Sequence, residues 1–82
     1  MYIHIGEDIL VKAKDIITIL DKDSVNSSTM IEEFLKRREE TTMNLAKGAF
    51  KSIVVTLDKV YLSPLASGTL KKRSSHLTIK DL

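Results

Sequence analysis

The stretch "KSIVVTLDKVYL", residues 51–62, is the clearest strand pair in this 82-residue chain. Its first half is rich in β-branched residues, and their alternation places Ile53, Val55 and Leu57 on one face of a strand. The polar pair Asp58-Lys59 then forms a turn before a second apolar run, "VYL". This stretch predicts two antiparallel strands joined by a turn.

Three shorter apolar runs precede this strand pair. Residues 2–5, "YIHI", alternate in polarity and lead through Gly6-Glu7-Asp8 into "ILVKA", residues 9–13. The third run, "DIITILD" (residues 15–21), is β-branched, bounded by charges and too short for an independent helix. We therefore expect three antiparallel strands within residues 2–21.

The hydrophobic period changes between residues 29 and 40, "TMIEEFLKRREE". Apolar residues recur there at helical spacing, at Met30, Ile31, Phe34 and Leu35. This segment predicts an amphipathic helix whose outer face carries Glu, Lys and Arg side chains. The segment that follows has no clear period and is expected to be a loop with a short strand near residues 43–45.

A second helix is predicted after the only proline. Ser63-Pro64 joins a good N-cap residue to a residue whose backbone suits the first helical position. A helix that starts there places Ala66, Leu70 and Leu77 on one apolar stripe. The cationic run "KKR", residues 71–73, then projects from the remaining sides of the helix.

These elements together indicate the α+β class: a small antiparallel β-sheet with one amphipathic helix after the third strand and a C-terminal helix. The length of 82 residues predicts a single domain that spans residues 1–82. A chain of this size buries only roughly 60–65% of its unfolded surface, so its core is marginal. Self-association would therefore stabilise it.

The composition and the N-terminal segment indicate where in the cell the protein is expected. There is no cysteine, which excludes disulfides and thiolate metal sites. Acidic residues at positions 7 and 8 interrupt the N-terminus before a long apolar run develops, which argues against a signal peptide. No apolar stretch approaches the ~20 residues of a membrane span. We therefore expect a cytoplasmic protein that makes no contact with a membrane.

Charge is distributed unevenly along the chain. Residues 1–23 carry three basic and five acidic residues, whereas residues 24–50 carry four of each. Residues 51–82 hold six basic and two acidic residues, a net charge of +4. The C-terminal third is therefore suited to an anionic partner such as nucleic acid.

The chain offers no set of residues for catalysis. Its two histidines, His4 and His76, lie near opposite ends without a spacing typical of a metal site or an activated nucleophile. Its three glycines form no phosphate-binding loop. We therefore expect no enzyme, no cofactor, no metal and no small-molecule substrate, and binding through an exposed surface is the function class that remains.

Four segments resemble the Rem family of bacterial extracellular-matrix regulators. They are "MYIHIGEDILV", "IEEFLKRR", "SIVVT" and "YLSPLASGTLKKR", in this order and with similar intervals along residues 1–75. The resemblance implies a small α+β protein that assembles into closed rings, binds promoter DNA through basic surface residues and promotes transcription of biofilm matrix genes. It implies no catalytic activity.

The chain departs from the family pattern at its basic residues. One branch of the family has adjacent arginines in the loop before the long strand, where this chain has Ala49-Phe50 between Lys47 and Lys51. Another family arginine corresponds to Asp15, next to Lys14. Either the three lysines substitute as compact point charges, or DNA is bound elsewhere, or this branch has shifted toward a protein partner.

The candidate DNA-binding residues are six cations: Lys71, Lys72, Arg73, Lys47, Lys51 and Lys14. For the run at 71–73, simple solvation of a helix surface is the competing explanation. The leading hypothesis is a cytoplasmic, ring-forming homo-oligomer that regulates transcription of extracellular-matrix genes by binding DNA, mainly through phosphate contacts. The alternative is an oligomeric scaffold that modulates a partner regulator by protein–protein contact without binding DNA.

Overall fold

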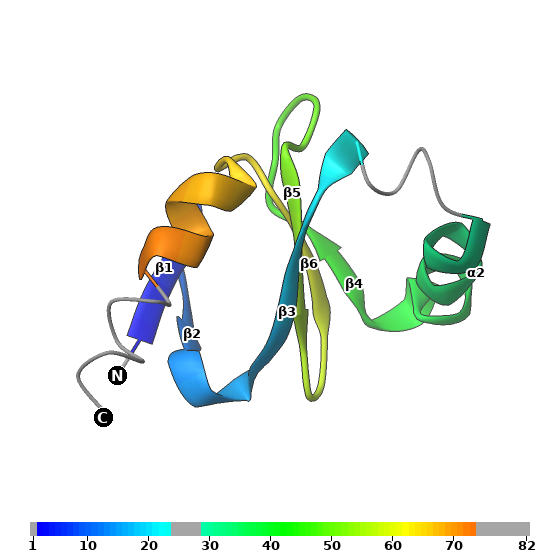
Figure 1. The fold of residues 1–82 in the computed structure, drawn as a ribbon, viewed down its shortest axis with the longest axis horizontal. Helices are drawn as coiled ribbons and strands as arrows, with labels where there is room; N and C mark the ends of the chain where they lie inside the picture. The colour runs from blue at the N-terminus through cyan, green and yellow to red at the C-terminus, as the bar shows by residue number, and fades with distance from the viewer. Residues whose placement is uncertain (1, 24–28, 74–82) are drawn as a thin grey trace.

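The computed structural model describes residues 2–23 and 29–73. In chain order the elements are β1 (Tyr2–Gly6), β2 (Ile9–Lys12), the 3-10 turn η1 (Ala13–Asp15), β3 (Ile16–Asp21), α2 (Thr29–Arg37), the 3-10 turn η2 (Glu39–Thr41), β4 (Thr42–Asn44), β5 (Ser52–Thr56) and β6 (Val60–Ser63). A C-terminal helix begins at residue 67 and is described as far as residue 73 (Figure 1). The α+β class expected from the sequence is confirmed.

The strands form two sheets. β1 and β2 make an antiparallel hairpin, and the other four strands lie in the order β3-β5-β6-β4. β5 pairs antiparallel with β3 and β6, whereas β4 pairs parallel with β6, so the larger sheet is mixed rather than wholly antiparallel. The three N-terminal strands lie where the sequence predicts them. However, β3 pairs with β5 instead of extending the hairpin, because the apolar strand β5 needs a neighbour on each side.

β5 is buried along its whole length, and its two faces belong to two apolar clusters. Val54 lies in the first cluster, which the β1–β2 hairpin and the C-terminal helix cover (Figure 1). Ile53 and Val55 lie in the second cluster, which α2 covers. Their predicted alternation is confirmed, but Leu57 is 66% exposed because it lies in the turn after β5. The four-stranded sheet is therefore a middle layer.

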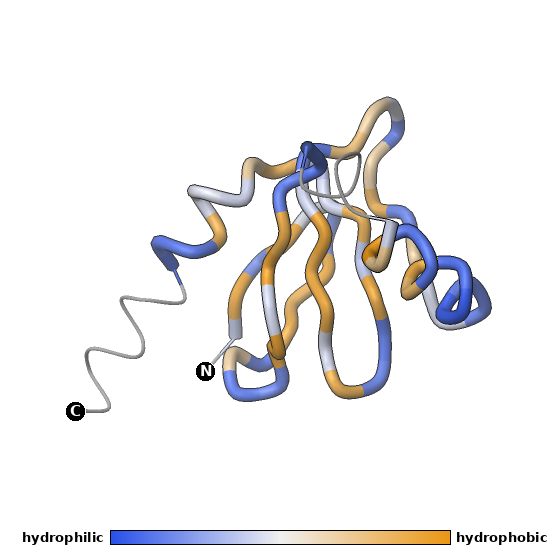
Figure 2. The backbone as a smooth tube through the Cα atoms, turned by 45° about the vertical axis from the view of Figure 1, so that its right-hand side comes forward, coloured by the Kyte–Doolittle hydropathy of each residue, from blue (hydrophilic) through white to orange (hydrophobic). Residues whose placement is uncertain are grey.

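The first cluster is the larger of the two. Its buried members come from both sheets, the loop before β5 and the C-terminal helix: Ile3, Ile5, Val11, Ile19, Leu45, Val54 and Leu70. Figure 2 shows the hydrophobic stretches concentrated in the strands and the hydrophilic ones in the turns and on α2. Most of the core thus lies between the hairpin and the sheet, and α2 covers a thinner second cluster.

α2 is shorter than the helix predicted over residues 29–40, and η2 continues the chain into β4. The Arg38 carbonyl accepts bonds from the hydroxyls of Thr41 (3.1 Å) and Thr42 (2.8 Å). These bonds turn the chain toward the sheet before another helical turn can form. The short strand expected near residues 43–45 is β4.

The strand register gives the four-stranded sheet two distinct ends. Ile16 lies opposite Thr56 at one end, which we call the lower end, where η1, η2 and the β5–β6 turn also lie (Figure 1). Asp21 lies opposite Ser52 at the other end, the upper end, where residues 45–51 form a loop. A strand as long as β3 separates these two ends by about 17 Å.

Ser63 closes the upper end of the sheet instead of capping a helix. It is the buried last residue of β6, and its hydroxyl donates to the Ile5 carbonyl of β1 while accepting the Leu65 N–H (3.0 Å). Opposite it, the Ser52 hydroxyl donates to the Leu65 carbonyl (2.7 Å). Because these bonds hold the segment after β6 outside a helix, the C-terminal helix begins later, and the predicted start at Pro64 is wrong.

The apolar stripe expected on the C-terminal helix is represented by one buried residue among those described. Leu70 is fully buried as predicted, whereas Ala66 is exposed and precedes the helix. Leu77 lies outside the described residues, as does His76. Leu70 therefore fixes the helix to the first cluster.

Gly6 allows the hairpin to approach the chain that leaves β6. Its φ of 138° is a backbone conformation that side chains rarely adopt. A Cβ at this position would lie 2.7 Å from Pro64 Cδ, well inside van der Waals contact. Only glycine therefore fits this position without a shift of the proline ring or of β1.

The first prediction concerns this glycine. Gly6→Ala should lower the free energy of unfolding by about 2–4 kcal/mol, because it combines backbone strain with overpacking. Urea unfolding followed by circular dichroism measures the change. Gly68→Ala is the matched control, since a Cβ there meets nothing within 4 Å and the residue is helical. It should raise stability by up to about 1 kcal/mol, and an equal loss in both variants would contradict the role of Gly6.

Candidate nucleic-acid interface

The C-terminal helix presents its cationic run to solvent. Lys71, Lys72 and Arg73 follow the buried Leu70 and are all exposed, as the sequence predicts. Arg73 also has a structural contact, because its Nη1 donates to the carbonyl oxygen of His4 in β1 at 2.8 Å. The run therefore supplies two exposed ammonium groups beside a guanidinium that is anchored on the hairpin.

A second group of exposed cations lies at the upper end of the sheet. Lys47 and Lys51 belong to the loop before β5. The Lys51 N–H donates to the Ser63 carbonyl (2.8 Å), and its own carbonyl accepts the Lys22 N–H (3.2 Å), which fixes the end of the loop between β6 and β3. Lys22 is exposed as well, so three lysines lie at this end.

Lys22 is a candidate that sequence reasoning missed. Its neighbour Asp21 pairs with Ser52, so the register of β3 on β5 brings Lys22 beside Lys51. The sequence shows two apolar runs that could pair, but it does not fix which strands become neighbours. The position of Lys22 therefore follows only from the observed register.

The two groups of cations are linked through Ser67 at the start of the C-terminal helix. Its hydroxyl donates to Asp21 Oδ1 (3.2 Å), which ties the helix to the upper end of the sheet. From there the helix runs toward β1, where Arg73 contacts His4 (Figure 1). Helical residues 67–73 span about 10 Å. The loop lysines therefore lie near the start of this helix, and Lys71 and Lys72 lie near its described end.

Carboxylates moderate the positive charge in this region. The half-buried Asp21 accepts the N–H of the exposed Asp23 (3.0 Å). The hairpin turn also brings Glu7 and Asp8 to this end, because the end of β1 is bonded to the end of β6. The excess of positive charge on one subunit is therefore modest, and repetition in an oligomer would strengthen it.

Lys14 lies apart from the other candidates. It is exposed in η1 at the lower end, about 17 Å along β3 from the upper end. Its surroundings carry both signs of charge, since Asp15 follows it and lines a shallow pocket with Lys12, Asp58 and Lys59. Within one subunit, Lys14 is therefore not brought together with the loop lysines.

Within residues 2–23 and 29–73, no three His, Cys, Asp or Glu side chains are grouped so that they could hold a metal ion. Over the same ranges, no helix has the length and apolar character needed to cross a membrane. His4 is exposed on β1, with its Nε2 within hydrogen-bonding distance of the Glu7 carbonyl. Its imidazole is thus engaged within its own hairpin.

The fold and the exposed cations define a small α+β protein with a surface suited to an anionic partner. The sequence matches the RemA-like family, described as extracellular matrix regulatory protein A-like, over residues 2–73. The chain therefore belongs to this family, and the resemblance seen in the sequence is confirmed. Extracellular matrix regulatory protein B of Bacillus subtilis (strain 168) is 46% identical to it over 77 residues, which cover 94% of each chain.

The second prediction separates the structural role of Arg73 from its charge. Arg73→Ala should lower the free energy of unfolding by about 0.5–1 kcal/mol, because it removes an exposed hydrogen bond to the hairpin. Lys72→Ala removes a neighbouring exposed cation and should change stability by less than about 0.5 kcal/mol. Urea unfolding compares the two variants, and equal stabilities would show that the contact between Arg73 and His4 contributes nothing.

Proposed function

We propose that this chain is a cytoplasmic regulator of transcription that forms closed homo-oligomeric rings and binds promoter DNA of extracellular-matrix genes. Its membership of a family of extracellular matrix regulatory proteins supports the regulatory role. The observation that carries the DNA-binding part is the set of exposed cations at the upper end and on the adjoining helix: Lys22, Lys47, Lys51, Lys71, Lys72 and Arg73. Both groups are held in place by bonds to the sheet and the hairpin.

The amino-acid types of the proposed contacts favour binding to DNA phosphates over recognition of bases. Most of the proposed contacts are lysines, which act as compact point charges, and Arg73 already has one donor engaged with His4. Bidentate recognition of guanine depends mainly on arginine. We therefore expect binding with a modest sequence preference and a strong dependence on salt.

Two uncovered sheet edges support the assembly. β3 and β4 are the outer strands of the four-stranded sheet, and each pairs on one side only within the described part of the chain. Unpaired strand edges in a small domain favour association, and a closed ring covers them all. A ring would also repeat a modest basic patch many times.

The acidic residues at the upper end favour one alternative. Asp23, Glu7 and Asp8 lie close to the lysines, and surfaces of mixed charge are common where two proteins meet. An oligomeric scaffold that binds a partner regulator through this surface, without DNA, is therefore the second candidate function.

The third prediction concerns assembly. Light scattering after gel filtration at micromolar concentration should give a mass of more than four subunits, because the core is small and two strand edges need cover. A monomer near 9.2 kDa over a wide range of concentration would contradict the ring.

The fourth prediction concerns DNA. In the Lys47→Ser/Lys51→Ser and Lys71→Ser/Lys72→Ser variants, binding should weaken on all DNA sequences alike. The slope of log K against log salt should become shallower by ~0.9 for each phosphate that the variant no longer neutralises. Arg73 is retained, so that its bond to the hairpin stays intact. Fluorescence anisotropy with labelled duplexes measures both effects.

Lys12→Ser/Lys59→Ser is the matched control, because it removes two exposed lysines from the lower end. Its affinity and salt slope should equal those of the parent. Parent protein that assembles but does not bind DNA at low salt would favour the scaffold. A loss of binding only in the Lys12→Ser/Lys59→Ser variant would show that DNA binds at the lower end and would contradict the proposed surface.

A further inference from the structure

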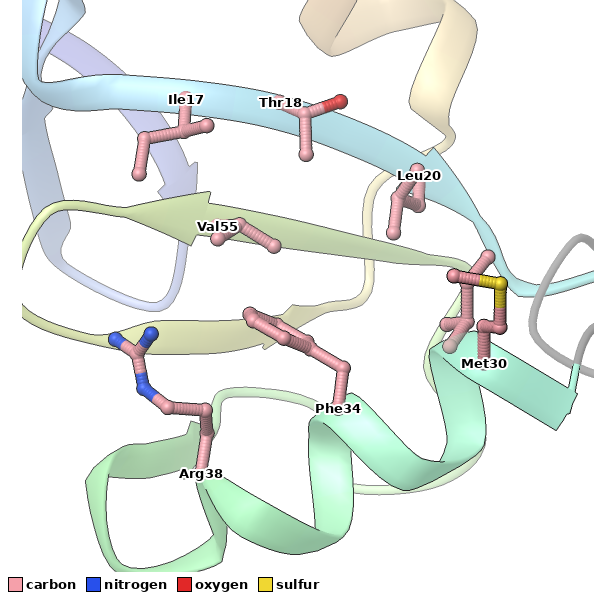
Figure 3. Close-up of a pocket in the computed structure, with 8 residues that line it drawn as sticks. Ile17, Thr18, Leu20, Met30, Phe34, Arg38 and Val55 are labelled. Carbon is pink, nitrogen blue, oxygen red and sulfur yellow. The ribbon is translucent and has the colours of Figure 1, made fainter.

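An open apolar groove lies between α2 and the edge strand β3. Its volume is ≈ 350 Å³, and its lining includes Ile17, Leu20, Met30 and Phe34. Figure 3 shows the β3 side chains directed toward Phe34 of α2, with Arg38 at one end. Ile17 is 61% exposed and Met30 81% exposed, so the groove beside the second cluster is open to solvent.

A bulge in β3 turns Ile17 toward this groove. Ile16 pairs with Thr56 and Thr18 with Val55, so Ile17 is an extra residue without a direct partner on β5. Bulges commonly re-aim a side chain at the edge of a sheet. Here the result is a large aliphatic side chain that lines the groove beside Thr18.

The outer strands carry no charge and no proline along the stretches that would pair, although β3 has a bulge near its start and β4 is only three residues long. From Ile16 to Leu20 the sequence "IITIL" has no charge and no proline, and the same is true of "TMN" in β4. Natural sheets protect exposed edges with lysines, prolines or covering segments. These two edges are therefore suited to pairing with another strand.

The directions of the two edge strands make them complementary. β3 is antiparallel to β5, β5 is antiparallel to β6, and β4 is parallel to β6, so β3 and β4 run in the same direction. A second copy placed beside β3 in the same orientation offers its β4 as a parallel neighbour, and the sheet continues from copy to copy. Such a head-to-tail contact leaves one unused edge at each end until a ring closes.

The charges at the lower end match this arrangement. β4 follows η2, whose Glu39 and Glu40 are exposed, and both β3 and β4 begin at the lower end. In the head-to-tail arrangement, the η2 of the second copy lies beside the start of β3. Lys14 lies two residues before that strand, with Asp15 between them, and Arg38 lies at the end of the groove. Two cations of the first copy, Lys14 and Arg38, therefore face the two glutamates of the second, with Asp15 as an acid on the same side as the cations.

From these observations we infer that the groove and the β3 edge receive the β4 edge and η2 of a second copy of this chain. The inference rests on the proposed function, in which the chain forms a closed homo-oligomer, and it assigns the two surfaces that meet. It also gives Lys14 a place at the subunit contact rather than on DNA.

The test uses one variant for each surface. Ile17→Lys places a charge in the groove beside β3, and Met43→Lys places one on β4, where the native side chain is 38% exposed. Each variant alone should elute as a monomer in gel filtration with light scattering. An equimolar mixture should give a species of twice the subunit mass, because one intact β3 surface and one intact β4 surface then remain to pair.

Leu10→Lys is the matched control, since Leu10 is an aliphatic residue, 59% exposed, on β2 of the hairpin, outside the four-stranded sheet. It should assemble like the parent, and circular dichroism should show the same secondary structure in all variants.

If the parent assembles and both test variants do too, the ring stands and this interface is wrong. If Ile17→Lys is monomeric and Met43→Lys still assembles, the contact is symmetric pairing of β3 with β3. If both variants are monomeric and their mixture gives no dimer, the contact lies elsewhere. Either result overturns the inference. A monomeric parent overturns both the ring and the interface.

Discussion

β5 is buried on both faces, and the other elements of the fold are arranged to cover it. Ile53 and Val54 are fully buried on opposite faces, and Val55 is nearly so. Burying each of these side chains contributes about 1.5–3 kcal/mol, so together they approach the whole stability of a small domain. The chain must therefore supply one cover for each face. The hairpin and the C-terminal helix cover one, and α2 covers the other.

This constraint also separates the surfaces of the molecule by function. The upper end holds the loop before β5 and the start of the C-terminal helix, and the exposed cations proposed to contact DNA lie there and along this helix. α2 covers its face incompletely, so an apolar groove remains beside β3. A DNA surface at one end of the sheet and a subunit contact along its edges do not overlap, and a ring could use both at once.

The sequence predicts which segments form strands and helices better than it predicts which strands pair with each other. Alternation in "SIVVT" and helical spacing in "MIEEFL" depend on local geometry, so the strands and α2 lie near their expected positions. The pairing of β3 with β5, and of β4 parallel to β6, depends on long-range packing that no local pattern encodes. Ser63 shows the same limit, because its hydroxyl bonds to a residue far away in sequence instead of capping the nearby helix. For the site, the exposure of residues 71–73 was predictable, whereas the place of Lys22 beside Lys51 and the separation of Lys14 from both followed from the register.

An electron cryomicroscopy map of the purified protein bound to duplex DNA is the sharpest test of the proposed ring and its DNA-binding surface, because it shows both together. We expect a closed ring in which the sheets continue from subunit to subunit. The loop of residues 45–51 and residues 71–73 of the C-terminal helix should lie against the DNA backbone. DNA bound along the lower ends of the sheets, or complexes that contain only isolated subunits, would contradict this claim.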